Sequence, residues 1–246
     1  MVYFSANRYL VEPIKIALIM IATAIVLGFL NTMVHELGHL FFGKKNGFKF
    51  NSLRIWFFKW TRVKGKIVFS LSMMKDEAGY TEMIPTKVDD LDRSLARMTR
   101  GALISSFVFM VIGIPAYFIN DLPFLLFVFW AMFFPIGAYT FFGNTIPAVN
   151  NGIRNDGAVL KGLRKNDDTS RVMVGVLKIQ ALLFQGFSPA EIDEEYYFNL
   201  PVIQEDDPAF ISLLNLRYLY YLDNGDFSNA NLTIKRLLGI VEEMSQ

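Results

Sequence analysis

The sequence predicts a mainly α-helical, polytopic membrane protein with three transmembrane helices. Apolar residues make up 53% of the 246 residues, and the 24 Phe exceed what an ordinary globular core needs. Three segments carry no charged side chain over 19, 20 and 32 consecutive residues, whereas crossing a bilayer takes about 20 helical residues. These segments are residues 16–34, 101–120 and 122–153. Beyond Gly157 the composition becomes that of a soluble helical segment.

The first transmembrane helix is expected at about residues 14–43, with Gly43 as its C-terminal stop. Its apolar stretch is too long for the core of a signal peptide and lacks a small-residue cleavage site, so it should remain in the mature protein. The second and third helices are expected at about residues 101–120 and 122–146, joined by a short connection.

The distribution of charge predicts the orientation of these helices. Residues 43–100 carry 13 Lys or Arg against 6 Asp or Glu, so the positive-inside tendency places them in the cytoplasm. The first and third helices then both end at the cytoplasmic face, and the C-terminus is cytoplasmic. We therefore expect a multi-pass protein of the cell membrane, with the lipid bilayer as its surroundings. No nucleic-acid partner is expected, and the oligomeric state is open.

The region between the first two transmembrane helices predicts a β-hairpin at about residues 50–74, because two partly alternating stretches flank "TRVKG". Two interpretations of this hairpin stay open. It could lie on the membrane surface, or one of its strands could pair with an extended substrate. The stretch "GYTEMIPTK" (79–87) predicts a loop, and residues 88–100 predict a short charged helix that leads into the second transmembrane helix.

Residues 161–246 are expected to form a cytoplasmic helical domain. Apolar residues at helical spacing on both sides of an Asn-Gly-Asp turn predict a helical hairpin over residues 209–243. The hairpin resembles one tetratricopeptide-type unit, but such units build a core only in several copies, and no second copy is visible. A helical cap on the membrane domain and a peptide-binding module are both possible interpretations.

The motif His35-Glu36-Leu37-Gly38-His39 interrupts the first apolar segment and contains the only two histidines of the chain. Residues four apart share one face of a helix, so both imidazoles can bind one metal ion. In an H-E-x-x-H motif the histidines hold zinc, and the glutamate is the general base for the attacking water. A charged residue inside a membrane helix costs about 2.5 to 3.5 kcal/mol, which favours a function for Glu36. Candidate partners of these side chains one turn earlier are Asn31 and Thr32.

A catalytic zinc site needs a third protein ligand and one open position. Because the chain has no further histidine and no cysteine, this ligand must be a carboxylate. The predicted orientation brings the end of the third helix to the same face of the membrane as His39, and Asp156 is the nearest acid there. Asp167 and Asp168 are the next candidates.

Together with HELGH, the residues Asn144, Pro147, Asp156 and Gly157 resemble the motifs of the site-2 protease family of intramembrane zinc metalloproteases. That family pairs HExxH with an Asn-x-x-Pro segment followed by Asp-Gly. The resemblance implies that His35, His39 and Asp156 bind zinc, that Glu36 is the base, and that Asn144 lies close to the bound substrate backbone. It covers residues 14 to about 160, so we expect a metalloprotease core over residues 1–160.

The chain also departs from this family. The interval from Pro147 to Asp156 is longer than in the compact motif, and the segment Gly101-Ala-Leu-Ile-Ser105 replaces a common Gly-Pro-x-x-Asn. About 57 residues between the first two helices are too few for an inserted PDZ domain, and the C-terminal segment lacks the α/β pattern of CBS domains.

The expected function is that of a zinc-dependent intramembrane endopeptidase with its active site toward the cytoplasm. Its partner would be a membrane-embedded or membrane-associated peptide substrate, either a transmembrane regulator or a short secreted or leader peptide. The alternative is a non-proteolytic peptide-binding or immunity factor that retains the metal site. A transporter is less favoured, because we find three spans and no internal repeat.

Overall fold

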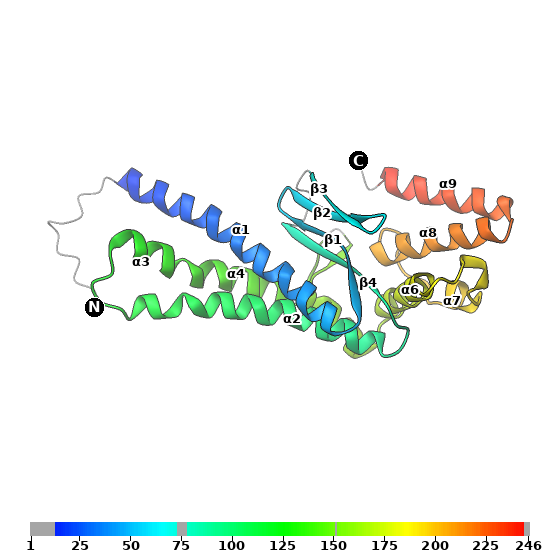
Figure 1. Cartoon of the computed structure of the whole chain (residues 1–246), viewed down its shortest axis with the longest axis horizontal. Helices are drawn as coiled ribbons and strands as arrows, with labels where there is room; N and C mark the ends of the chain where they lie inside the picture. The colour runs from blue at the N-terminus through cyan, green and yellow to red at the C-terminus, as the bar shows by residue number, and fades with distance from the viewer. Residues whose placement is uncertain (1–12, 73–77, 151, 244–246) are drawn as a thin grey trace. The chain divides into compact units, whose positions relative to one another are not determined.

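A computed structural model describes residues 13–72, 78–150 and 152–243. These residues divide into two compact units. The first unit contains the described residues of Met1–His39, Leu53–Thr81 and Gly101–Asn144, and the second contains those of Leu40–Ser52, Glu82–Arg100 and Thr145–Gln246. The predicted class is confirmed: the chain is mainly helical, with three long apolar helical segments and a four-stranded antiparallel sheet (Figure 1).

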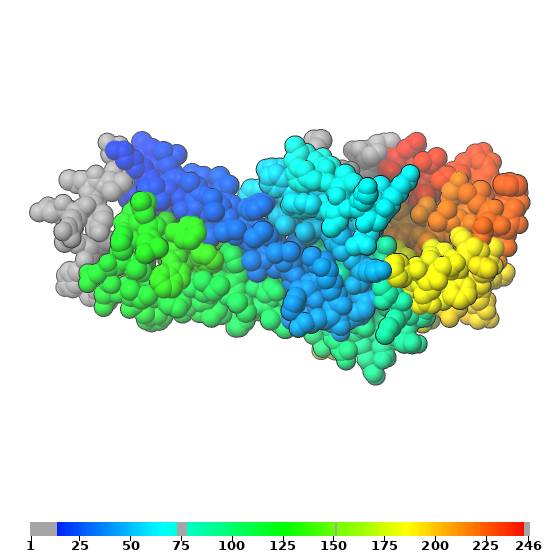
Figure 2. Space-filling model, viewed as in Figure 1, coloured from blue at the N-terminus to red at the C-terminus, as the bar shows by residue number. Residues whose placement is uncertain are grey.

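Three helical segments within the described residues are long and apolar enough to cross a membrane: Ile14–Lys45, Leu91–Tyr117 and Phe124–Thr145. The first corresponds to helix α1 (Pro13–Lys45), which ends with two lysines that complement its C-terminal dipole. Helix α1 is blue in Figure 2. Large apolar side chains stand exposed along it, among them Leu18, Ile21 and Ile25. Such exposure suits a lipid environment, where apolar surface is not penalised.

The second segment begins earlier than predicted. Helix α2 runs without a break from Leu91 to Ile112 and continues into the 3-10 helix η1 (Ile114–Tyr117). The separate charged helix expected at 88–100 is therefore the first part of α2. No proline interrupts the chain between Leu91 and Ile112, so helical hydrogen bonding continues through the change from charged to apolar residues.

The third segment is broken where one helix was predicted. Helix α3 (Phe124–Ala131) and helix α4 (Phe133–Thr145) meet at Met132. Pro135 has no N–H to donate to the carbonyl of Ala131, four residues earlier. The Tyr117 hydroxyl donates to that carbonyl instead, at 3.0 Å. This bond satisfies a polar backbone group that lipid could not.

The sheet is larger than the predicted hairpin, because the stretch 50–74 contains two turns rather than one. Its strands are β1 (Phe48–Ile55), β2 (Phe58–Val63), β3 (Lys66–Leu71) and β4 (Gly79–Pro85), in the order β3-β2-β1-β4. Lys64 and Gly65 both have positive φ, which suits the tight turn between β2 and β3.

The prediction of a loop at 79–87 is wrong. Strand β4 occupies most of that stretch, and strand β1 is its neighbour in the sheet. The opposite edge is strand β3, in the cyan part of Figure 2. Every residue of β3 is exposed, and its large apolar side chains include Ile67, Phe69 and Leu71.

The C-terminal segment is helical, as predicted. It contains α5 (Asp156–Lys165), α6 (Asp168–Gln185), the 3-10 helix η2 (Pro189–Glu191), α7 (Glu195–Phe198), α8 (Pro208–Asp223) and α9 (Phe227–Glu243). Helices α8 and α9 form the predicted helical hairpin. The core between α6, α7 and α8 includes Val172, Ile179, Tyr197 and Leu213, each buried.

Close packing against α2 explains why the fourth position of HELGH, Gly38, is a glycine. A Cβ added there would lie 2.6 Å from Ser105 Oγ, 2.8 Å from Ala102 Cα and 3.0 Å from the Gly101 carbonyl oxygen. The absence of a side chain thus lets α1 and α2 approach closely.

We expect Gly38→Ala to lower the free energy of unfolding by about 1 to 3 kcal/mol relative to Gly28→Ala, because the added methyl overpacks the contact with α2. Gly28 is the matched control, since its added Cβ would make only an ordinary 3.5 Å contact with Trp56 and both changes gain the same helix propensity. Thermal unfolding in detergent measures the difference. Equal stability of the two variants would contradict the close approach.

Candidate metal centre

The two histidines of HELGH lie on one face of α1. Their ring centroids are 5.1 Å apart and their planes are perpendicular. The side chain of His35 is buried, and that of His39 is half-buried. Helical spacing alone produces this pair, since residues i and i+4 stack on the same face.

Asp156 begins helix α5, and a short hairpin places it there. Strand β5 (Val149–Asn150) pairs with β6 (Ile153–Arg154), and this hairpin takes up the interval between Pro147 and Asp156 that exceeds the family motif. A carboxylate in the first turn of a helix is favoured by the positive end of the helix dipole.

The side chain of Asn155 forms hydrogen bonds with the backbone on both sides of this hairpin. Its side-chain oxygen accepts hydrogen bonds from the backbone N–H groups of Ala148 and Ala158, each at 3.0 Å. Its amide nitrogen donates to the carbonyl of Ile146 at 2.7 Å. Asn155 is therefore the N-cap of α5. Its side chain also links α5 to the backbone of Ile146 and Ala148, which precede the hairpin.

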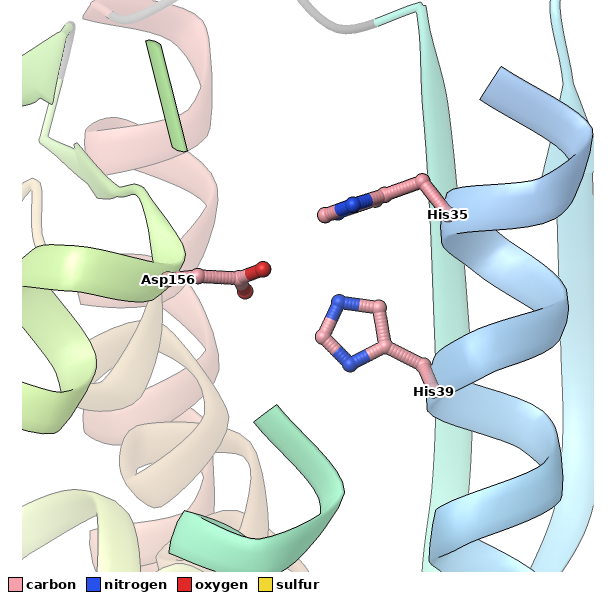
Figure 3. Close-up of side chains that lie close together, drawn as sticks. All are labelled: His35, His39 and Asp156. Carbon is pink, nitrogen blue, oxygen red and sulfur yellow. The ribbon is translucent and has the colours of Figure 1, made fainter. Parts of the chain in front are cut away.

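His35, His39 and Asp156 come together as a group that could hold a metal ion. Each offers one ligand atom, and these atoms all lie within 4.8 Å of one another. Figure 3 shows the two imidazoles of α1 and the Asp156 carboxylate pointing toward one another. Two imidazoles and one carboxylate suit zinc with a fourth position open, and the same set also suits iron(II).

Ser106 of α2 contacts His35, one of the candidate metal ligands, and was not predicted. Its hydroxyl oxygen lies 2.9 Å from His35 Nδ1, and Ser106 is fully buried. When Nδ1 carries the ring proton it donates to Ser106, which leaves the Nε2 lone pair for a metal. The sequence carried one signal for this residue, a hydroxyl within an otherwise apolar run, but nothing indicated its partner.

We expect Ser106→Ala to weaken zinc binding by about tenfold to a hundredfold, because the imidazole loses the contact that orients it. Ser105→Ala is the matched control, since the Ser105 hydroxyl donates to the Gly101 carbonyl within its own helix. Competition with a coloured zinc chelator measures both affinities. Equal affinities in the two variants would refute the orienting role.

Glu36 is buried, with 5% of its surface exposed, and does not belong to the metal-binding group. Its Oε2 accepts a hydrogen bond of 2.7 Å from the Thr81 hydroxyl. Thr81 belongs to strand β4, in the stretch expected to be a loop, so it too was missed. Glu36 therefore follows His35 in the sequence but lies outside the group that could hold a metal ion.

The two side chains proposed as partners one turn earlier bind elsewhere. Asn31 is buried and donates from Nδ2 to the Ile136 carbonyl and the Thr140 hydroxyl of α4. Thr32 donates to the Gly28 carbonyl of its own helix. Asn31 thus links α1 to α4 rather than contacting a histidine.

Asn144 lies near the end of α4 and is half-buried. Its side-chain nitrogen donates to the Thr140 carbonyl, 3.0 Å away. The structure thus ties Asn144 to its own helix, and its role in binding substrate stays a prediction.

The two reserve candidates for the third ligand have other roles. Asp167 caps α6 and forms an ion pair of 3.0 Å with Arg154, and Asp168 pairs with Arg171 at 3.3 Å. Partial burial would raise the pKa of Asp167, but hydrogen bonds from Ser170 and the Arg154 guanidinium outweigh it and lower that pKa below its usual value. Neither residue belongs to the group formed by His35, His39 and Asp156.

Comparison with protein-family models, curated proteins and solved structures finds no match.

Proposed function

We propose that this protein is a zinc-dependent endopeptidase of the cell membrane that hydrolyses a peptide bond within or beside the bilayer. The observation that carries the proposal is the group of His35, His39 and Asp156. The buried Glu36 next to His35 and the three helices long enough to span a membrane support it. The motif resemblance to the site-2 protease family supports the same activity.

Within this proposal, His35, His39 and Asp156 hold the ion. Zinc, when bound, supplies a Lewis acid and lowers the pKa of a bound water to about 7. Glu36 takes a proton from the attacking water and passes it to the leaving amine, as a general base and then a general acid. Asn144 binds the substrate backbone. The charge bias of residues 43–100 places the site toward the cytoplasm.

A helical substrate must unwind before it can react, because its carbonyls are already hydrogen-bonded within the helix. We therefore propose substrates with poor helix formers near the cleaved bond, either a transmembrane regulator or a short leader peptide. No inserted PDZ domain is expected in this chain, which favours the shorter peptide.

The test is cleavage by purified protein in lipid of a panel of doubly labelled single-span and leader peptides. We expect at least one peptide to be cut, cleavage to stop after chelation, and stoichiometric zinc to restore it. Peptides that bind the zinc-loaded protein but are never cut would favour the binding or immunity factor instead.

A further inference from the structure

Strand β4 contacts the side chain of Glu36 at two positions. Thr81 places its hydroxyl oxygen 2.7 Å from Glu36 Oε2 and 3.1 Å from the Glu36 backbone carbonyl oxygen. At Gly79, an added Cβ would lie 2.7 Å from Thr32 Cγ2, 2.9 Å from Glu36 Oε1 and 3.0 Å from Glu36 Cγ. Strand β4 therefore lies directly against the carboxylate: Thr81 donates a hydrogen bond to it, and Gly79 leaves space for it because glycine has no side chain.

The hydrogen bond from Thr81 is expected to be strong. A hydroxyl that donates to a carboxylate makes a charge-assisted bond, and removing the donor from a buried acceptor leaves that acceptor's desolvation uncompensated. Because Glu36 is 5% exposed, water is poorly placed to replace the lost donor. Without the Thr81 donor, the Glu36 carboxylate would be held less firmly in its present position.

An ion bound by the neighbouring His35 would attract a carboxylate that is no longer held. Glu36 follows His35 directly in α1, and carboxylate oxygen is a normal zinc ligand. If Glu36 became a fourth protein ligand, it would fill the position that a catalytic site keeps open for water. The same residue can serve as general base only while it stays off the metal.

We propose that Thr81 is a positioning residue that holds the Glu36 carboxylate away from the metal, with Gly79 providing the space for it. This inference rests on the proposed function, since it assumes an ion at His35, His39 and Asp156. It also makes the sheet part of the site, because the orientation of the base depends on strand β4.

Cobalt(II) is the probe for this role, since its visible absorption reports the number and type of its ligands. The full-length protein in detergent is stripped of metal and titrated with cobalt. In Thr81→Val, which keeps the side-chain shape, we expect a changed absorption spectrum and about tenfold tighter cobalt binding, because Glu36 joins the ligands. Thr81→Ser, which keeps the hydroxyl, should match wild type.

Two further variants separate this mechanism from a general disturbance. Adding Glu36→Gln to Thr81→Val should remove both the spectral change and the tighter binding. Gly79→Ala should change the spectrum in the same direction as Thr81→Val, because its methyl group would displace the Glu36 carboxylate as well as the Thr32 methyl group. Thr86→Val is the matched control, since it removes a threonine hydroxyl that donates to the Gly47 carbonyl at 2.8 Å.

With a peptide that wild type cuts, Thr81→Val should lower kcat without raising KM, and Thr81→Ser should restore kcat. A Thr81→Val protein with the wild-type spectrum and affinity would overturn the positioning role and leave the proposed protease intact. Wild type that binds no cobalt would overturn both. The expected spectral change in a protein that cuts no peptide would support the positioning role and count against the protease alone.

Discussion

Asp156→Ala is expected to reduce bound zinc from about one ion per chain to almost none. Asp156 is the only carboxylate in the group with His35 and His39 among the described residues, and two imidazoles alone bind zinc far more weakly than three protein ligands. The loss of a negative ligand also leaves the charge of the ion less compensated. We expect an affinity loss of at least about a hundredfold, larger than that of any contact that only orients a ligand.

Plasma mass spectrometry on detergent-purified protein, with zinc and iron both measured, tests this expectation. Asp168→Ala is the matched control, because Asp168 is an exposed acid close by in the sequence that pairs with Arg171. His35→Ala should lose the metal as Asp156→Ala does. If Asp156→Ala retains a full equivalent of zinc while His35→Ala loses it, the third ligand lies elsewhere.

Glu36→Gln is expected to lower kcat for peptide cleavage by about a thousandfold or more while zinc content stays at the wild-type level. The amide keeps the size of the side chain and can still accept from Thr81 through its oxygen, so the local packing should survive. It cannot take a proton from water. We therefore expect zinc content to stay unchanged while kcat falls.

Cleavage of the peptide identified with wild type and metal analysis of the same preparation provide the measurement. Glu82→Gln is the control, because Glu82 lies in the same strand as Thr81 and its carboxylate accepts from the Ser52 hydroxyl. A Glu36→Gln protein that cleaves at the wild-type rate would show that the base has been assigned wrongly.

The membrane-spanning segments were predictable because their signal is local. A long run of apolar residues indicates a span whatever the rest of the chain does, and each predicted segment is helical in the structure. Breaks within these segments were less predictable. The break at Met132 depends on Pro135, and a tertiary bond from Tyr117 takes the carbonyl that the proline leaves unpaired.

The sheet was harder to predict than the helices, because strand β4 depends on pairing with a distant segment. The turn at Lys64 and Gly65 was predicted, but Gly79–Pro85 looked like a loop because it is short and bounded by glycine and proline. The neighbouring strand β1 supplies the hydrogen bonds that make it a strand, and β1 lies some thirty residues earlier in the chain. Strand pairing of this kind depends on context more than on propensity.

By itself, the sequence determined the class of the protein and the pairing of His35 with His39, because apolar run length and helical periodicity act between near neighbours. Asp156 could be nominated from the orientation of the helices and from a family resemblance. Only the tertiary structure decided which partners surround these residues: Ser106 at His35, Thr81 and Gly79 at Glu36, and α4 at Asn31. Each of these contacts joins segments far apart in the chain, and no spacing within one segment specifies a contact with another.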